Sequence, residues 1–208
     1  MKETPILFST KMVKAILDNR KTQTRRVITR PEQWMIEFNG ESHTVENKYG
    51  ESVNLLTLCP YGQTGDLLWV RERFYVQPEL WEVSRDSQPI HYHADGNTEC
   101  LEDYISKPSI HMPKWAARIW LEITNVGIQR VQDITGSDAK AEGIGEPYAC
   151  RSESGYNFEM RYQFRKFWNS INEKRGYGWD SNPFVWVIEF RRKMKLKRMV
   201  NNEIISVS

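Results

Sequence analysis

Apolar residues recur at helical spacing in two segments, residues 10–17 and residues 158–171. This spacing places them on one face of a helix, so it predicts two amphipathic helices. Ser9 or Thr10 is a suitable capping residue for the first of them. A third helix is predicted at residues 138–142, after a run of residues that favour helix starts.

Alternating or continuous apolar residues predict four strands. Their ranges are 21–28, 67–76, 116–126 and 184–190. The last is a nearly continuous apolar run, which is typical of a strand buried on both faces. Short strands separated by loops, with a few short helices, predict an α+β domain built on a small mixed sheet or barrel.

The chain of 208 residues is long enough for one domain with insertions. We expect a single domain over residues 1–192, with two polar excursions near residues 29–58 and 77–113. The first excursion contains a weak strand near residues 34–38, and residues 145–157 are expected to be a loop. Residues 193–208 form a basic tail that we expect to be mobile.

Composition narrows the functional classes. The net charge is only +2, so any attraction to nucleic acid has to come from local basic patches. The three cysteines, Cys59, Cys100 and Cys150, are widely spaced and odd in number, which favours a reducing cytoplasm over a disulfide framework. No apolar run approaches the roughly 18 residues that a membrane span requires.

The densest chemical signal is the basic segment 20–26, which follows the first predicted helix. It contains one lysine, two threonines and three arginines, and it has no acidic residue. Such a segment repels itself unless an anionic ligand or a buried carboxylate lies opposite. It is therefore a candidate ligand or catalytic site, and the alternative is a solvated basic turn.

Glu72 is the second signal, because its side chain would share a strand face with apolar residues. A carboxylate in that position is paired or has a raised pKa. Either a functional site or a structural ion pair with an arginine satisfies this requirement.

Histidines and tryptophans suggest weaker alternatives. His91, His93, Cys100 and His111 include suitable zinc ligands, but no CxxC or HExxH spacing accompanies them, and a loop with hydrogen-bonded histidines is the favoured interpretation. No metal or other cofactor is predicted. Trp168 and Trp186 are expected in the core, whereas Trp69 and Trp115 are candidate stacking surfaces for a base.

Several motifs together resemble the ASCH family, whose small β-barrel is related to RNA-binding PUA domains. The resemblance covers most of residues 5–191 and rests on the basic segment 20–26 together with the runs Gly65-Asp66-Leu67-Leu68-Trp69-Val70-Arg71-Glu72, Ala139-Lys140-Ala141-Glu142-Gly143-Ile144 and Val185-Trp186-Val187-Ile188-Glu189-Phe190. The runs Cys-Pro-Tyr-Gly, Ser-Ile-His-Met-Pro and Asn-Pro-Phe-Val-Trp are similar to those of the larger phage and prophage form.

The resemblance implies several functions. One small bacterial branch of the family removes acetyl groups from N4-acetylcytidine, and its motif has a lysine and a threonine spaced like Lys21 and Thr24, with a later glutamate matched by Glu142. Another branch has been linked to RNA cleavage, and the PUA relationship implies RNA binding. We therefore expect a metal-independent amidohydrolase acting on an acylated nucleoside. A non-catalytic RNA-binding module and a ribonuclease are the alternatives.

In the hydrolase interpretation Thr24 is the nucleophile, Lys21 takes its proton, and Glu142 holds Lys21 or relays protons to the leaving amine. Lys21 and Thr24 converge only if Lys21 lies in the turn before the strand. A lysine in a cleft contributes little to packing, so Lys21→Ala is expected to abolish turnover and to change the melting temperature by only a few degrees. The same residues could instead be ligand contacts without a covalent step. The expected substrate contacts are Arg20, Arg25, Arg26, Trp69, Arg71, Glu72 and His111.

Overall fold

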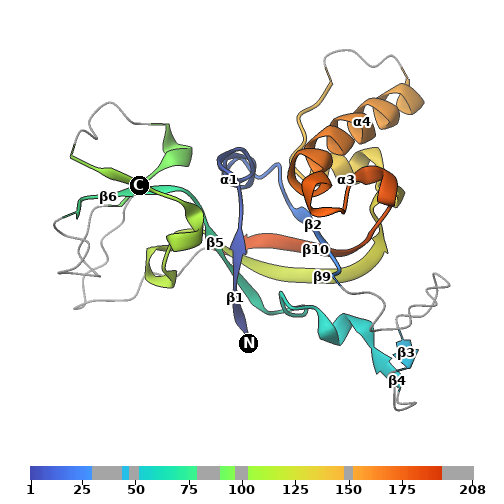
Figure 1. The fold of residues 1–208 in the computed structure, drawn as a ribbon, viewed down its shortest axis with the longest axis horizontal. Coiled ribbons are helices and arrows are strands. Elements are labelled where there is room, and N and C mark those ends of the chain that lie inside the picture. The colour runs from blue at the N-terminus through green and yellow to red at the C-terminus, as the bar shows by residue number, and fades with distance from the viewer. Residues whose placement is uncertain (30–43, 47–51, 79–89, 97–102, 148–151, 194–208) are drawn as a thin grey trace.

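The computed structural model describes residues 1–29, 44–46, 52–78, 90–96, 103–147 and 152–193. A five-stranded sheet in the order β1-β5-β9-β10-β2 forms its centre (Figure 1). These strands are β1 (Glu3–Leu7), β5 (Leu67–Arg71), β9 (Trp120–Arg130), β10 (Phe184–Lys193) and β2 (Gln23–Val27). β1 pairs with β5 in parallel, and all the other pairs in this sheet are antiparallel. The α+β class and the mixed sheet are therefore confirmed.

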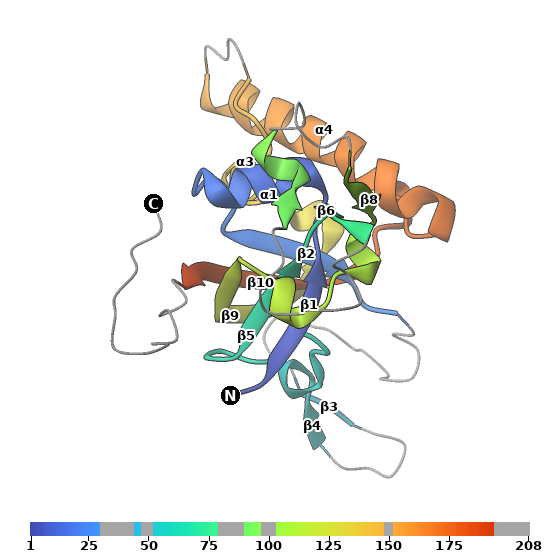
Figure 2. The ribbon, with the colours of Figure 1, turned by 90° about the vertical axis from the view of Figure 1, so that its left-hand side faces the viewer.

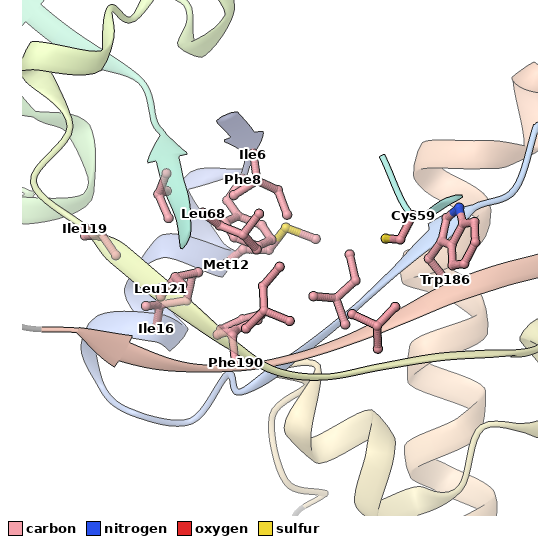
Figure 3. Close-up of a cluster of buried hydrophobic side chains, with 14 of the residues drawn as sticks. Ile6, Phe8, Met12, Ile16, Cys59, Leu68, Ile119, Leu121, Trp186 and Phe190 are labelled. Atoms are coloured by element: carbon pink, nitrogen blue, oxygen red, sulfur yellow. The ribbon is translucent and has the colours of Figure 1, made fainter. Parts of the chain in front are cut away.

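The helices pack against the sheet through two apolar clusters. The helix α1 (Thr10–Leu17) packs its buried side chains against one face, where Phe8, Met12, Leu121 and Phe190 belong to the largest apolar cluster (Figure 3). The helices α3 (Gly136–Ala141) and α4 (Glu153–Asn172) supply the second apolar cluster together with residues of β10 (Figure 2). β10 contributes to both clusters, which explains its nearly continuous apolar run.

Two smaller sheets lie outside the central one. The strands β7 (His91–Tyr92), β6 (Phe74–Val76) and β8 (Ile105–Lys107) form the first, at the left of Figure 1. The strands β3 (Thr44–Glu46) and β4 (Ser52–Asn54) form the second.

The central sheet is open between its two edge strands, β1 and β2. The pairing of the described strands runs from β1 to β2 and does not join these two directly. Pro5 lies in β1, where a missing backbone N–H is tolerated because the strand is an edge. One side chain bridges the opening, because Nη2 of Arg26 on β2 donates to the carbonyl oxygen of Leu7 on β1 at 2.7 Å. The expected barrel is thus a sheet without a closed ring of hydrogen bonds.

The predicted helices all occur, with different ends. Ser9 caps α1 by accepting from the backbone N–H of Met12, as expected. α3 begins at Gly136, two residues earlier than predicted, and ends at Ala141, one residue earlier than predicted. α4 begins at Glu153, so residues 153–157 of the loop expected at 145–157 are helical. Ser152 caps this helix, because its side chain accepts from the backbone N–H of Gly155.

Two predicted strands need correction. Residues 67–76 are not one strand, because β5 ends at Arg71 and β6 begins at Phe74 in a different sheet. The break occurs at Glu72, whose backbone N–H donates to Sδ of Met112 at 3.2 Å. The strand predicted at 116–126 is β9, displaced by four residues because a 3-10 turn occupies Lys114–Ala116. β1 was not predicted at all.

Some expectations fall on residues that the structure does not describe. The weak strand near residues 34–38 and nearly all of the tail at 193–208 lie outside the described residues. The division into one domain with two excursions stays a prediction. None of the described helices combines the length and the apolar character that a membrane-spanning helix needs.

Candidate functional site

A tight turn between α1 and β2 places Lys21 beside Glu142. Asn19 adopts the left-handed backbone conformation with φ of 57°, and the backbone N–H groups of Arg20 and Lys21 both donate to the carbonyl of Ala15. The backbone of Lys21 then forms an isolated antiparallel bridge with Glu142. Lys21 therefore precedes the strand, as its convergence with Thr24 requires.

Gly143 makes this close approach possible. Its φ is +88°, and a Cβ atom at this position would lie 2.9 Å from Cβ of Ala15 and 3.1 Å from Cβ of Lys21. Any side chain would thus be strained in its backbone and would also clash with two neighbours. The lack of a side chain at Gly143 therefore lets α1, the basic segment and the end of α3 pack closely.

Lys21 and Glu142 form a buried ion pair. Nζ of Lys21 lies 2.7 Å from Oε2 of Glu142, and the two side chains are 0% and 2% exposed. Nζ also donates to the carbonyl oxygens of Gln23 at 2.7 Å and of Glu142 at 2.8 Å, so all three N–H groups of the ammonium have acceptors. Burial lowers the pKa of Lys21, and the charge of Glu142 opposes this shift.

Arg25 pairs with the other oxygen of the same carboxylate. Its Nη1 lies 3.2 Å from Oε1 of Glu142, and its Nη2 lies 3.3 Å from Oδ2 of Asp138 in α3. The guanidinium also lies over the ring of Phe164 in α4, 5.9 Å from its centroid. Two buried cations therefore share Glu142, and among the described residues Asp138 is the one that gives Arg25 a second carboxylate.

A cavity of about 640 Å³ opens beside this pair. Both edges of the central sheet contribute to its wall, as do the 3-10 helix Leu55–Leu58 and the buried side of α4. Thr24, Arg25 and Glu142 line the cavity, whereas Lys21 does not. Such a volume lies in the range of small-molecule sites.

The cavity is both aromatic and positively charged. Its walls include Tyr61, Phe164, Phe167, Trp168 and Trp186, and its charged groups are Arg25, Arg26, Arg71, Arg175 and Glu142. Among the described residues, Nε of Arg26 and Nε of Arg71 are the buried side-chain nitrogens that have no hydrogen-bond partner. Buried polar atoms in that state usually mark the place of a water, an ion or a ligand.

The structure thus brings together five of the residues that the sequence singled out. Thr24, Arg25, Arg26, Arg71 and Glu142 line one cavity, and Lys21 lies directly behind Glu142. Because Lys21 is fully buried with three hydrogen bonds, it is not the weakly packed cleft lysine that the sequence argument assumed. The assumption that Lys21 is loosely packed is wrong, and the small stability effect predicted for Lys21→Ala stays a prediction.

The other predicted contacts lie away from the cavity. Arg20 is half-exposed and pairs with Asp18 at 2.9 Å. Trp69 is buried with Trp120 in a small separate cluster. His111 is exposed at the end of the 3-10 helix Ser109–His111.

Glu72 belongs to a separate ion-pair network. Its carboxylate accepts from Nε and Nη2 of Arg118 at 2.9 and 3.0 Å, and Arg118 also binds Asp95 through Nη1 at 2.7 Å. Burial raises the pKa of Glu72, and Arg118 partly offsets this rise. Arg118 also covers the ring of Tyr92 at 3.9 Å, so this network ties β6 and β7 to the start of β9.

The histidines make ring contacts outside the cavity. His91 meets the ring of Tyr104 edge-on at 4.9 Å, and His93 stacks on Tyr75 at 5.8 Å. Within the described ranges, no three His, Cys, Asp or Glu side chains are grouped so as to hold a metal ion. Cys100, the remaining proposed ligand, lies outside these ranges.

Sequence reasoning missed several residues that line the cavity. Tyr61 lies within the Cys-Pro-Tyr-Gly run, and Arg175 lies in a basic pair just before Gly176. Trp168 and Trp186 were expected in the core, where they are indeed buried, yet both also face the cavity. The turn-forming residues next to Tyr61 and Arg175 were the available signal, because loops at the ends of elements often carry binding residues.

Comparison with known proteins gives one similar solved structure, an ASCH domain from Lactobacillus crispatus JV V101. The two chains are 14% identical with a TM-score of 0.37, and the match covers 92% of this chain and 79% of that one. No protein-family model and no curated protein matches the chain. The solved structure bears the family name that the sequence motifs suggest, and its low identity and TM-score leave membership of that family a prediction.

Proposed function

We propose that this chain is a metal-independent amidohydrolase that removes the acyl group from an acylated nucleoside such as N4-acetylcytidine. The observation that carries the proposal is the placement of Thr24 and Glu142 in the wall of one cavity, with Lys21 bound to the carboxylate of Glu142 at 2.7 Å. A hydroxyl nucleophile and a carboxylate base facing one cavity are the groups that amide hydrolysis without a metal requires.

The proposed reaction begins with attack by Oγ1 of Thr24 on the acyl carbonyl carbon, while Glu142 accepts the hydroxyl proton. The carbon–nitrogen bond then breaks, and Glu142 returns the proton to the leaving exocyclic amine. A water molecule then attacks the acyl ester of Thr24 while Glu142 accepts its proton; the ester carbon–oxygen bond breaks, Glu142 returns the proton to Oγ1 of Thr24, and the free acid is released. In this scheme Arg26, which lines the same cavity, stabilises the oxyanion in both steps.

Lys21 has a positioning role in this scheme, which differs from the sequence-based expectation that it is the base. Its three N–H groups are already donated, two of them to backbone carbonyls, and its side chain does not line the cavity. The ammonium instead fixes the orientation of the Glu142 carboxylate and stabilises its charged form.

The alternatives use the same cavity. A non-catalytic RNA-binding module would need only the arginines and aromatic walls, and a ribonuclease would need an acid and a base beside a phosphate. Of the histidines within the described ranges, His91, His93 and His111 do not line the cavity, so none of these three is placed to act there as the acid or base of a ribonuclease. We rank hydrolysis first because a carboxylate, Glu142, and a hydroxyl-bearing residue, Thr24, line the same cavity.

The test is chromatographic. The purified chain is incubated with N4-acetylcytidine, with and without EDTA, and the release of cytidine is measured. We expect conversion that survives EDTA, is lost in Thr24→Val, and persists in Thr22→Val, because Thr22 is exposed and lies outside the cavity wall. Absence of conversion by the folded chain, or equal activity of the two variants, would refute the proposal.

A further inference from the structure

Three arginines of the cavity have positive charge that the described residues do not balance. Arg26, Arg71 and Arg175 line the cavity, and none of them forms an ion pair within the described part of the chain. The one carboxylate in the wall, Glu142, is already shared by Lys21 and Arg25. The described wall of the cavity therefore carries an excess of positive charge next to a carboxylate that two other cations already share.

Arg26 and Arg175 lie near enough for their charges to interact, and Arg71 lies opposite Leu7, the residue to which Arg26 is bonded. Burial lowers the pKa of Arg26, and nearby Arg175 lowers it further, whereas Tyr61 and Glu142 raise it. Arg26 is fixed by its bond to the carbonyl of Leu7, and the guanidinium of Arg71 lies over the ring of Trp69, 5.6 Å from its centroid. Guanidinium groups of this kind match the oxygens of a phosphate.

Two unpartnered nitrogens indicate that this cluster is built for a ligand. Nε of Arg26 and Nε of Arg71 are buried without an acceptor. A buried donor without a partner is costly, so two such donors on residues of one cavity wall gain stability when a bound anion supplies acceptor oxygens for them.

An edge of the sheet gives the same cavity a way to bind a planar base. Phe190 donates to the carbonyl of Thr22, and Ile28 donates to the carbonyl of Phe184, so the alternation in β2 directs the backbone groups of Arg25 and Val27 away from β10. Both residues line the cavity. The strand edge therefore offers alternating N–H and C=O groups, with aromatic side chains available for stacking.

We propose that the ligand of this cavity is a nucleotide rather than a neutral nucleoside, with its phosphate held by Arg26, Arg71 and Arg175 and its base between the edge of β2 and the aromatic walls. This inference rests on the proposed function for the location of the site, and it assigns the substrate class. It requires binding only, so it stands or fails independently of turnover.

The experiment is calorimetric titration of the whole chain with cytidine, with cytidine 5′-monophosphate and with the dinucleotide CpC, at low and at high salt. We expect at least one phosphorylated ligand to bind about tenfold or more tightly than cytidine, and this preference to shrink as salt rises. A stronger response to the monophosphate identifies a free nucleotide as the source of the phosphate, and a stronger response to CpC identifies RNA. Equal binding of all three ligands would overturn the inference.

Matched variants locate the phosphate. Arg175→Gln removes a cavity arginine, and Lys174→Gln removes its exposed neighbour, which does not line the cavity. Arg71→Gln and Arg73→Gln form a second pair of the same kind. We expect the variants of Arg175 and Arg71 to lose about tenfold in affinity for the preferred phosphorylated ligand but not for cytidine. If the two variants of a pair bind the phosphorylated ligand with equal affinity, the cavity arginine of that pair does not hold the phosphate.

Discussion

Replacement of Glu142 by glutamine tests the buried charge arrangement directly. The change preserves shape and one acceptor oxygen, but it leaves Lys21 and Arg25 buried without the carboxylate they share. A buried ion pair that loses one partner costs about 3–5 kcal/mol. Lys21 keeps two carbonyl acceptors and Arg25 keeps Asp138, so we expect the lower end, about 3 kcal/mol.

This loss is large enough for an ordinary melting experiment. For a chain of this length the melting temperature falls by about 2–4 °C per kcal/mol, so we expect a decrease of about 6–12 °C. The measurement is thermal unfolding followed by circular dichroism at pH 7. Glu146→Gln is the control, because Glu146 is an exposed partner of Lys140 with a side chain 60% exposed. Its loss is expected to be below about 1 kcal/mol.

A comparison with Lys21→Met sharpens the test. In that variant Glu142 keeps its contact with Arg25 at 3.2 Å, so one charge of each sign remains in contact. We therefore expect Lys21→Met to be less destabilising than Glu142→Gln. The reverse order, or a melting temperature of Glu142→Gln within about 1 °C of the native chain, would refute the reasoning that Glu142 balances two buried cations.

Three further predictions concern buried charges and backbone strain. Arg118→Leu leaves Glu72 buried without a cation, so it should cost about 3 kcal/mol at pH 8 in urea unfolding. The loss of stability should be smaller at pH 5, because a folded protein that holds a carboxyl with a raised pKa becomes more stable as pH falls and that carboxyl takes up a proton. An equal loss of stability at pH 8 and pH 5 would contradict this prediction. Gly143→Ala should cost about 1–3 kcal/mol in the same assay, whereas Gly145→Ala, with open space at its Cβ, should be nearly neutral; equal losses would exclude steric strain at Gly143. The pKa of Lys21 is lowered from 10.5, so the native chain should gain stability relative to Lys21→Met as pH rises toward 10.5, and a difference independent of pH would exclude that shift.

Sequence periodicity predicted the elements whose burial is repetitive. The apolar stripe of α1 and the continuous run of β10 reflect packing along their whole length, so both were recognised. β1 was missed because its only fully buried residue is Ile6, and its hydrogen bonds come from a parallel partner about sixty residues further along the chain. The break at Glu72 was also missed, since the residues on either side share a pattern but belong to different sheets.

The residues of the candidate site also fall into those that the sequence could identify and those that it could not. Lys21, Thr24 and Arg25 could be singled out because they lie in one basic run. Tyr61 and Arg175 could not, since their role depends on how the turns after other elements meet the edge of β2. The stability role of Lys21 was equally hidden, because its burial is created by Gly143 and Glu142 from a distant part of the chain.

The bridge between Lys21 and Glu142 also determines at which stage of translation the site can fold. The two residues are separated by 121 positions, and their pairing involves both backbone and side chains. A nascent chain that has not yet reached α3 therefore carries the basic segment without the carboxylate that neutralises it. Assembly of the cavity must wait for the later part of translation, so ribosome-bound intermediates stalled before Glu142 should lack ligand binding altogether.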